Sequence, residues 1–271
     1  MKKFLHRLDV RVAATVAALL LAGCATNPIT GRSQLQLVSA QQAIDASAQA
    51  YAQQMSQYKA KGKLDQNSTD VKRVRSIANR LIPQAERMRP QSRGWHWEVN
   101  VIDTPEVNAF CMAGGKIAVY KGLIDKVHPT DAELAEVMGH EMGHALAGHQ
   151  REQMSIALAN NMALDVVGVA VGAGQLTQQA LAAAANVAIR LPYSRRMESE
   201  ADRIGIELAA RAGYDPHAAV TLWQKMIKLE GGNAPPAFLS DHPSSEARLQ
   251  ALKALIPTMM PLYEAARKGG K

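Results

Sequence analysis

The chain has 271 residues, of which 47% are hydrophobic and 20% are charged, and its formal net charge is +7 at pH 7. A chain of this length suits one domain with a substantial core, so no second module is required. Its basic residues are dispersed and aromatic residues make up only 4% of the chain, which argues against a nucleic-acid-binding protein. No repeat of about 34 residues occurs, which argues against a tetratricopeptide array.

The first predicted element is a signal peptide over residues 1–23. Four basic residues precede an apolar run at residues 12–22, which is too short to span a bilayer as a permanent helix. The sequence LAGC that ends at Cys24 resembles the lipobox of bacterial lipoproteins, and this resemblance implies cleavage before Cys24 and lipidation of its sulfur. An uncleaved signal anchor is the alternative. Cleavage would lower the formal charge from +7 to +4, because the segment holds four basic residues and one acidic residue.

Cys24 also bears on the expected location. Ala25 rather than Asp follows it, and by resemblance to bacterial lipoproteins this implies sorting to the outer membrane rather than the inner one. We therefore expect a lipid-anchored protein at the periplasmic face of the outer membrane, with residues 24–38 as a polar tether. With Cys24 lipidated, Cys111 is the only remaining thiol, so no intramolecular disulfide can form.

Two helices and a short sheet are predicted after the tether. Residues 39–61 predict a helix with an N-terminal cap, and residues 71–88 predict a second one with an apolar face. Residues 95–103 and 116–120 alternate between apolar and polar side chains, as strands do. The expected fold class is therefore α+β and mainly helical, with residues 39–271 forming a single domain.

The most informative motif is His-Glu-Met-Gly-His at residues 140–144, which has the HExxH arrangement of a zinc peptidase. Thr130 begins a capping box, and an apolar stripe continues through the motif, so the segment predicts a helix. His140 and His144 then share one helix face, where both rings can bind one zinc ion, and Glu141 can serve as the general base for the attacking water. The alternative is a chance occurrence of the motif, so a third metal ligand is required.

Residues 194–211 predict a second helix that supplies this ligand. Glu198 is expected to bind the metal, while Asp202, one turn later, is expected to accept the second ring N–H of a ligating histidine. Glu200 would face elsewhere. The alternative is a solvated acidic surface among neighbouring arginines, but the upstream HExxH motif favours the ligand role. The sequence thus predicts one Zn²⁺ ion held by His140, His144 and Glu198.

His149 does not extend this ligand set. The metzincin pattern requires Gly and His where this chain has Ala147 and Gln150. We expect His149 instead to hydrogen-bond to a metal ligand or at the helix end.

Residues 152–191 are rich in Ala, Val and Gly, but polar residues interrupt them, so the apolar runs are too short for a membrane span. We interpret the segment as two helices around a glycine hinge that cover the active-site cleft or a partner surface. A lipid-touching hairpin is the alternative. Residues 215–229 and 243–255 predict closing helices.

The HExxH motif followed by ExxAD at residues 198–202 resembles the gluzincin zinc metallopeptidases of the HtpX/Oma/CAAX-protease family. Residues 108–117 resemble the NAF-x-x-PGG strand of that family, with Ala113 where the family often has Pro. Residues 240–243 resemble its T/S-x-HP segment, and Arg248 follows as in the family. The resemblance covers about residues 71–255 and is strongest to the LoiP-like and BepA-like periplasmic lipoprotein branch, without a tetratricopeptide domain. It implies a zincin-like fold with a small sheet beside the HExxH helix.

The resemblance also implies a substrate-binding edge strand around Asn108. A peptide added as an extra antiparallel strand is held by its backbone, whatever its side chains. Asn108 and Ala109 are therefore the expected substrate contacts. The alternative is an ordinary interior hairpin with Gly114 and Gly115 as its turn.

A further implication concerns His242, whose loop approaches the metal in this family. The imidazole is expected either to fill the fourth metal position in a resting state or to donate a hydrogen bond to the oxyanion. The alternative is a simple helix N-cap.

These features together predict a membrane-anchored periplasmic zinc endopeptidase that cleaves misfolded or envelope proteins and is attached to the membrane through Cys24. The alternative is a noncatalytic lipoprotein chaperone or scaffold that retains a structural zinc site. Glu141 favours the enzyme, because a structural site needs no general base.

Overall fold

The computed structural model describes residues 24–65, 68–169, 194–230, 237–243 and 245–269. The strands are β1 Cys24–Thr26, β2 Ser33–Leu35, β3 Leu64–Asp65, β4 Glu98–Ile102, β5 Ala109–Met112 and β6 Lys116–Tyr120. The α-helices are α2 Ala40–Ala60, α3 Thr69–Met88, α4 Lys121–Val127, α5 Asp131–Leu146, α6 His149–Val169, α8 Arg195–Arg211, α9 His217–Glu230, α10 Ala237–Asp241 and α11 Glu246–Gly269, and a 3₁₀ helix, η1, covers Pro90–Gly94. The predicted fold class, α+β and mainly helical with a small sheet beside the HExxH helix, is confirmed.

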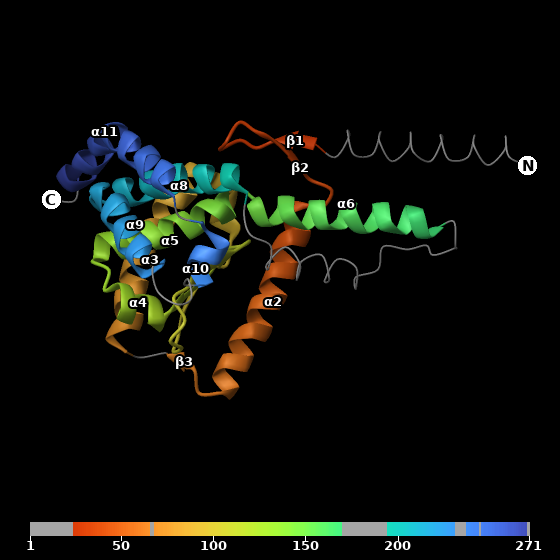
Figure 1. The fold of residues 1–271 in the computed structure, drawn as a ribbon, viewed down its shortest axis with the longest axis horizontal. Coiled ribbons are helices and arrows are strands. Elements are labelled where there is room, and N and C mark those ends of the chain that lie inside the picture. The colour runs from red at the N-terminus through yellow and green to blue at the C-terminus, as the bar shows by residue number, and fades with distance from the viewer. Residues whose placement is uncertain (1–23, 66–67, 170–193, 231–236, 244, 270–271) are drawn as a thin grey trace, which may run out of the picture.

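Helix α5 lies at the centre of the molecule, between the sheet and the surrounding helices (Figure 1). It begins at the predicted capping box, in which the Thr130 hydroxyl accepts from the Glu133 N–H and the Glu133 carboxylate accepts from the Thr130 N–H. Residues 133–146 of this helix are all buried. A helix that is buried on every side can hold its polar groups away from water only if other elements supply partners for them.

Helices α5 and α8 approach each other closely because glycine stands at their contact. A Cβ atom added to Gly143 would lie 2.8 Å from the Ala201 carbonyl oxygen, and one added to Gly205 would lie 2.6 Å from the His140 nitrogen. Both distances are shorter than van der Waals contact between such atoms. The two glycines therefore bring the helix that carries the HExxH motif against the helix that carries Glu198.

The larger sheet has the strand order β3-β4-β6-β5. Strands β4 and β6 are parallel, whereas β5 and β6 are antiparallel and are joined through Gly114 and Gly115, whose φ angles are +85° and +80°. Such angles strain any residue with a side chain. Strand β5 is thus one arm of the hairpin that turns at Gly114 and Gly115, and it lies at the edge of the described sheet and not in its interior.

Several predicted boundaries differ from the structure. The strand predicted over residues 95–103 is only β4, because the preceding turn folds as η1 and Trp95 and Trp97 pack on the core. Strand β3 and helix α10 were not predicted, and α11 continues well past residue 255. The predicted glycine hinge and second helix of the 152–191 segment lie largely outside the described residues.

Residues 24–38, predicted as a polar tether, hold a β1–β2 hairpin that packs on the body of the protein (Figure 1). The side-chain amides of Asn27 and Gln34 donate to the Ala147 carbonyl oxygen at 2.6 and 3.0 Å, and both side chains are buried. The last carbonyl groups of a helix have no partner within the helix. The polar side chains that indicated a tether therefore include hydrogen-bond donors to the end of α5.

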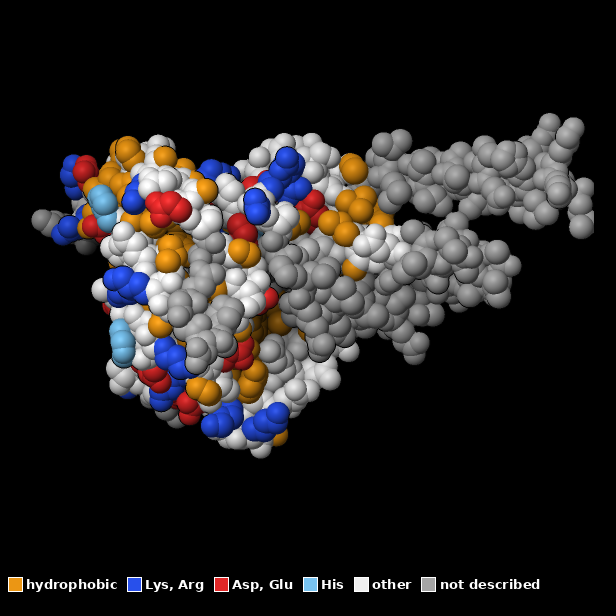
Figure 2. Space-filling model, in the orientation of Figure 1, with side chains coloured by type: hydrophobic (Ala, Val, Ile, Leu, Met, Phe, Trp, Pro, Cys, Tyr) orange, Lys and Arg blue, Asp and Glu red, His pale blue; other side chains and the backbone are white. Residues whose placement is uncertain are grey.

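Over the part of the chain that the structure describes, no helix has both the length and the apolar character needed to cross a bilayer. On the face shown in Figure 2, basic and acidic side chains are interspersed. The predicted signal peptide at residues 1–23 lies outside the described residues.

Candidate metal centre

Two of the candidate ligands come from α5. The Nε2 atoms of His140 and His144 lie 3.1 Å apart, because residues four positions apart share one face of a helix. Both side chains are buried.

Glu198 of α8 and His242, which follows α10, complete the cluster. The Oε1 atom of Glu198 lies 3.4 Å from His144 Nε2, and its Oε2 atom lies 3.5 Å from His140 Nε2. His242 Nδ1 lies 3.2 Å from His140 Nε2 and 2.9 Å from Glu198 Oε1. The four ligand atoms all lie within 4.8 Å of one another.

The spacing of these atoms fits a tetrahedral metal ion. Metal–nitrogen bonds of about 2.0–2.1 Å at tetrahedral angles place neighbouring ligand atoms about 3.3 Å apart. The distances above, from 2.9 to 3.5 Å, bracket that value. Three imidazoles and a carboxylate are also the donor types that such a metal prefers.

The buried groups of the cluster shift one another's pKa values. Burial lowers the pKa of His144 well below its ordinary value, so the ring keeps a lone pair for a metal. Burial also lowers the pKa of His140, but hydrogen bonds to Asp202 and Glu198 outweigh it and raise that pKa. Burial would raise the pKa of Glu198, yet hydrogen bonds from His140, His144 and His242 lower it far below the ordinary value. Glu198 is therefore a carboxylate at neutral pH.

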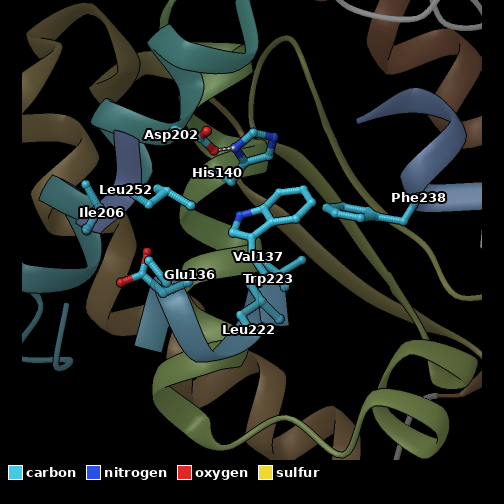
Figure 3. A pocket seen from close by; sticks show the side chains of 10 residues that line it. Glu136, Val137, His140, Asp202, Ile206, Leu222, Trp223, Phe238 and Leu252 are labelled. Carbon is cyan, nitrogen blue, oxygen red and sulfur yellow. Dashed lines mark ion pairs between the residues drawn. The ribbon is translucent and has the colours of Figure 1, made fainter. Parts of the chain in front are cut away.

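Asp202 lies on the other side of His140, as shown in Figure 3, with its Oδ1 atom 3.0 Å from Nδ1 of that ring. Arg248 of α11 clamps the same carboxylate, donating from Nη2 to Oδ1 at 2.6 Å and from Nε to Oδ2 at 2.8 Å. Its Nη1 atom lies 2.8 Å from Glu198 Oε2, and its guanidinium stacks 3.7 Å from the centre of the Trp223 ring. Arg248 thus compensates the charge of two buried acids, a role the sequence alone did not reveal although Arg248 belongs to a recognised motif segment.

Glu141 points from α5 toward His242, whose Nε2 atom lies 3.3 Å from Glu141 Oε1. Burial raises the pKa of Glu141 to about 7. Nearby Glu198 and Asp241 contribute to this rise, while His242 and Arg248 oppose it. A carboxylate with a pKa near neutrality can both accept and return a proton at physiological pH.

A cavity of about 150 Å³ opens beside Glu141 and His242. Strand β5 lines one side of it with residues 108–112, and Gln54 of α2, Tyr120, Gln150 and Asp241 contribute to the rest. The structure therefore brings Asn108 and Ala109 to the same cavity as Glu141.

The structure places His149 against an expected metal ligand, as one of the two predicted arrangements has it, and adds Glu200 as a partner that sequence reasoning missed. This buried ring lies 2.9 Å from His144 on one side and 2.9 Å from Glu200 on the other. Glu200 faces away from the four-residue cluster, as expected. The only signals in the sequence are the five-residue step from His144 to His149 and the position of Glu200 two residues after Glu198. Cys24 is exposed in β1, outside the cluster.

Comparison with known proteins agrees with this geometry. Residues 68–256 match the sequence profile of peptidase family M48. The metalloprotease LoiP of Escherichia coli is 32% identical over 251 residues, which cover 91% of this chain and 96% of LoiP. The mitochondrial metalloendopeptidase OMA1 of Arabidopsis thaliana is 42% identical over 159 residues, or 59% of this chain and 31% of OMA1. OMA1 of Bos taurus is 31% identical over 256 residues, or 88% of this chain and 47% of OMA1.

The chain therefore spans about half or less of the length of these OMA1 proteins. The comparisons contradict the predicted location at the periplasmic face of the outer membrane, because the relatives include mitochondrial enzymes of plants and mammals. The prediction relied on the residue after Cys24, and these relatives do not support that residue as a sorting signal.

Proposed function

The chain belongs to peptidase family M48, and we propose that it is a zinc endopeptidase that hydrolyses peptide bonds in unfolded or misfolded proteins. The observation that carries this proposal is the joint position of four metal-competent side chains and a buried carboxylate, Glu141, at one end of a cavity lined by an edge strand.

We assign His140, His144 and Glu198 as the ligands of one zinc ion. When bound there, zinc would polarise the scissile carbonyl group and make an attacking water more acidic. Asp202 holds His140 through its Nδ1 atom, and Arg248 holds Asp202, so the ring cannot rotate without breaking a buried hydrogen bond to a fixed carboxylate.

Glu141 is assigned as the general base. Its carboxylate would take a proton from the attacking water and return it to the amine of the departing peptide. Its burial removes competing bulk water, and its pKa of about 7 suits a group that must gain and lose a proton in each cycle.

We assign His242 a blocking role. Its Nδ1 atom lies as close to His140 and Glu198 as the other ligand atoms do, and its Nε2 atom faces Glu141. A ring in this position occupies the space that water and substrate need, so it must withdraw before hydrolysis. His242→Ala should then raise the rate of proteolysis. If His242 instead donates to the oxyanion, the same change should lower kcat about a hundredfold.

The proposed substrate is an extended peptide that pairs with the edge of β5, along which the described residues place no further strand. Backbone pairing does not depend on the side chains of the substrate, so it suits a broad range of unfolded chains. Asn108 and Ala109 stand at the end of this strand that lines the cavity. Folded proteins rarely expose such an extended segment, so we expect unfolded proteins to be preferred.

The test is incubation of the zinc-loaded protein with an unfolded protein, followed by mass spectrometry of the cut sites, with Glu141→Gln as the control. Cleavage by the wild-type protein alone supports an endopeptidase. Binding of the unfolded protein without any cut would favour the noncatalytic chaperone or scaffold, in which the zinc site is structural.

We also propose that residues 1–23 are a signal peptide, that residues 39–271 form one peptidase domain, and that Cys24 is lipidated and attaches the protein to a membrane. The exposed thiol of Cys24 supports the lipidation, and a hydrophobic core that runs from Val71 to Met259 supports the single domain. Incorporation of labelled palmitate, with Cys24→Ala as the control, tests the lipidation. Equal labelling of both proteins would exclude Cys24 as the acceptor.

A further inference from the structure

The β1–β2 hairpin precedes the part of the chain that matches the family profile, yet it contacts the helices of the metal centre (Figure 1). Besides the bonds from Asn27 and Gln34 to the end of α5, Arg203 of α8 donates to the Ile29 carbonyl oxygen at 3.1 Å. The hairpin thus lies against α5, α6 and α8 at the point where these helices come together.

Arg32 in this hairpin joins α6 to α8. It donates to both carboxylate oxygens of Glu152, each at 2.6 Å. Its Nε and Nη2 atoms donate to Glu200 at 2.7 and 3.2 Å. The side chains of Arg32 and Glu200 are each only 15% exposed, so these charge-assisted bonds are partly shielded from water.

Glu200 continues the contact to the metal centre through His149. Its Oε2 atom lies 2.9 Å from His149 Nε2, and His149 Nδ1 lies 2.9 Å from His144 Nδ1. The His144 ring is completely buried, and its remaining nitrogen, Nε2, is the one that faces His140 and Glu198.

His144, His149, Glu200 and Arg32 thus form a row of hydrogen-bonded side chains. Only one arrangement of protons satisfies this row when His144 Nε2 binds a metal. Nε2 must then carry a lone pair, so the proton of the neutral ring sits on Nδ1 and is donated to His149 Nδ1. His149 in turn carries its proton on Nε2 and donates it to the Glu200 carboxylate. Arg32 supplies donors to the same carboxylate. No group changes its charge in this row; only the position of the proton on each neutral ring is set.

Without the carboxylate, the opposite arrangement becomes available. His149 could then carry its proton on Nδ1 and donate it to His144 Nδ1, which would leave the proton of His144 on Nε2. A protonated Nε2 cannot bind a metal. The carboxylate at the far end of the row therefore favours the metal-binding tautomer of His144.

We propose that Arg32, Glu200 and His149 are positioning residues that hold His144 in its metal-binding tautomer. Through Arg32, the β1–β2 hairpin then contributes to metal binding. The proposal rests on the assignment of His144 as a metal ligand in the proposed function.

The first experiment measures zinc affinity by competition with a chromophoric chelator. Groups that hydrogen-bond to metal ligands typically contribute about 10–100-fold to affinity. We expect losses of this size for His149→Ala and Glu200→Ala, and a loss of about tenfold for Arg32→Ala. Arg203→Ala is the matched control, because Arg203 also holds the hairpin but has no contact with the row, and we expect its affinity within about twofold of wild type.

A double variant distinguishes an effect of Arg32 through Glu200 from an effect on the packing of the hairpin. Arg32 also binds Glu152, so Arg32→Ala could act by loosening α6. If Arg32 acts through Glu200, then adding Arg32→Ala to Glu200→Ala should cause no further loss of zinc affinity. A further tenfold loss in the double variant, or equal losses for Arg32→Ala and Arg203→Ala, would overturn the proposal.

Nitrogen NMR of histidine-labelled, zinc-loaded wild-type protein tests the tautomers without any variant that could fail to fold. His144 should carry its proton on Nδ1 and His149 on Nε2, and a proton on Nδ1 of His149 would contradict the inference. His144→Ala keeps this test apart from the proposed function. Undiminished zinc binding by that variant would refute the assignment of His144 as a ligand. Loss of zinc in that variant, together with full zinc affinity in Glu200→Ala, would refute only the positioning role of the row.

Discussion

Two buried acids of α5, Glu136 in its first half and Glu141 in its second, are held in different ways. In the first half, Glu136 is buried, its Oε1 atom has no hydrogen-bond partner among the described residues, and burial raises its pKa well above the ordinary value. In the second half, Glu141 shares its surroundings with His242 and Arg248, and its pKa rises only to about 7. The two residues have the same chemistry and lie in the same helix.

What differs is the set of elements packed outside each half. Figure 3 shows Glu136 beside a small cavity lined by apolar side chains of α8, α9 and α11, whereas Asp202 faces His140 on the other side of it. Arg248 and the ligand histidines compensate charge near the second half, whereas the acids Asp202 and Asp215 add to the rise in the pKa of Glu136. A buried acid keeps its charge only where a neighbouring element supplies a cation or a donor. The metal centre therefore depends on α8 and α11 as much as on the motif in α5.

The largest expected effect lies in the second half of α5. Glu141→Gln should lower kcat by at least about a hundredfold while zinc stays bound, because the amide keeps the shape of the side chain but accepts no proton from water. Steady-state proteolysis and metal analysis of the same sample check this. Activity within about tenfold of wild type would remove Glu141 from the role of general base.

The next effect concerns the ligand that α8 contributes. Glu198→Ala should lower zinc affinity by more than about a hundredfold, since it removes one of three assigned ligands. It also leaves the positive charge of Arg248 without one of its two acidic partners. Glu207→Ala on the same helix is the matched control, because the ion pairs of Glu207 among the described residues are with Arg203 and Arg211. Full metal content in Glu198→Ala would show that another carboxylate binds the metal.

A smaller effect is expected where the two helices touch. Gly143→Ala places a methyl group against the Ala201 carbonyl oxygen, which cannot move without shifting α8. Alanine favours a helix over glycine by about 1 kcal/mol, but the clash should outweigh this and lower the free energy of unfolding by about 1–2 kcal/mol. Chemical denaturation measures it. Gly94→Ala, which meets no atom within 4 Å, serves as the control, and equal stability of both variants would show that the helices can separate at no cost.

The smallest effect is a gain of stability in the first half of α5. The folded protein keeps the proton of Glu136 at a pH where the unfolded chain has lost it, so stability falls as the pH rises above about 4.5. Glu136→Gln carries no such proton and should be more stable than wild type at pH 7, by on the order of 1 kcal/mol, with no difference near pH 4. Denaturation at several pH values tests this, and a constant difference across that range would mean that Glu136 does not titrate as described.

Much of the site could be predicted because its signals are local. The capping boxes at Ser39 and Thr130 join residues three positions apart, and both form as expected. The two histidines of the HExxH motif lie one turn apart on any helix, so their shared face followed from the sequence alone. The second helix and the place of Glu198 within it likewise followed from the apolar face of residues 194–211.

The remaining features could not be predicted, because they depend on segments that are distant in the sequence. Residues 24–38 were interpreted as a polar tether, since nothing within them shows that the end of α5 needs their donors. Helix α10, which precedes His242, has only five residues and no pattern of its own.

The sequence by itself determined the α+β class, the helices that carry the chemistry and the candidate ligands they present, because hydrogen bonds within a turn and side-chain periodicity are properties of neighbouring residues. Only the tertiary structure decided which buried groups are paired. Arg32 and Glu200 are 168 positions apart, and His140 and His242 are 102 apart. Charge in a buried site is set by whichever side chains the fold brings within hydrogen-bond distance, and that proximity is not encoded in any local stretch of the chain.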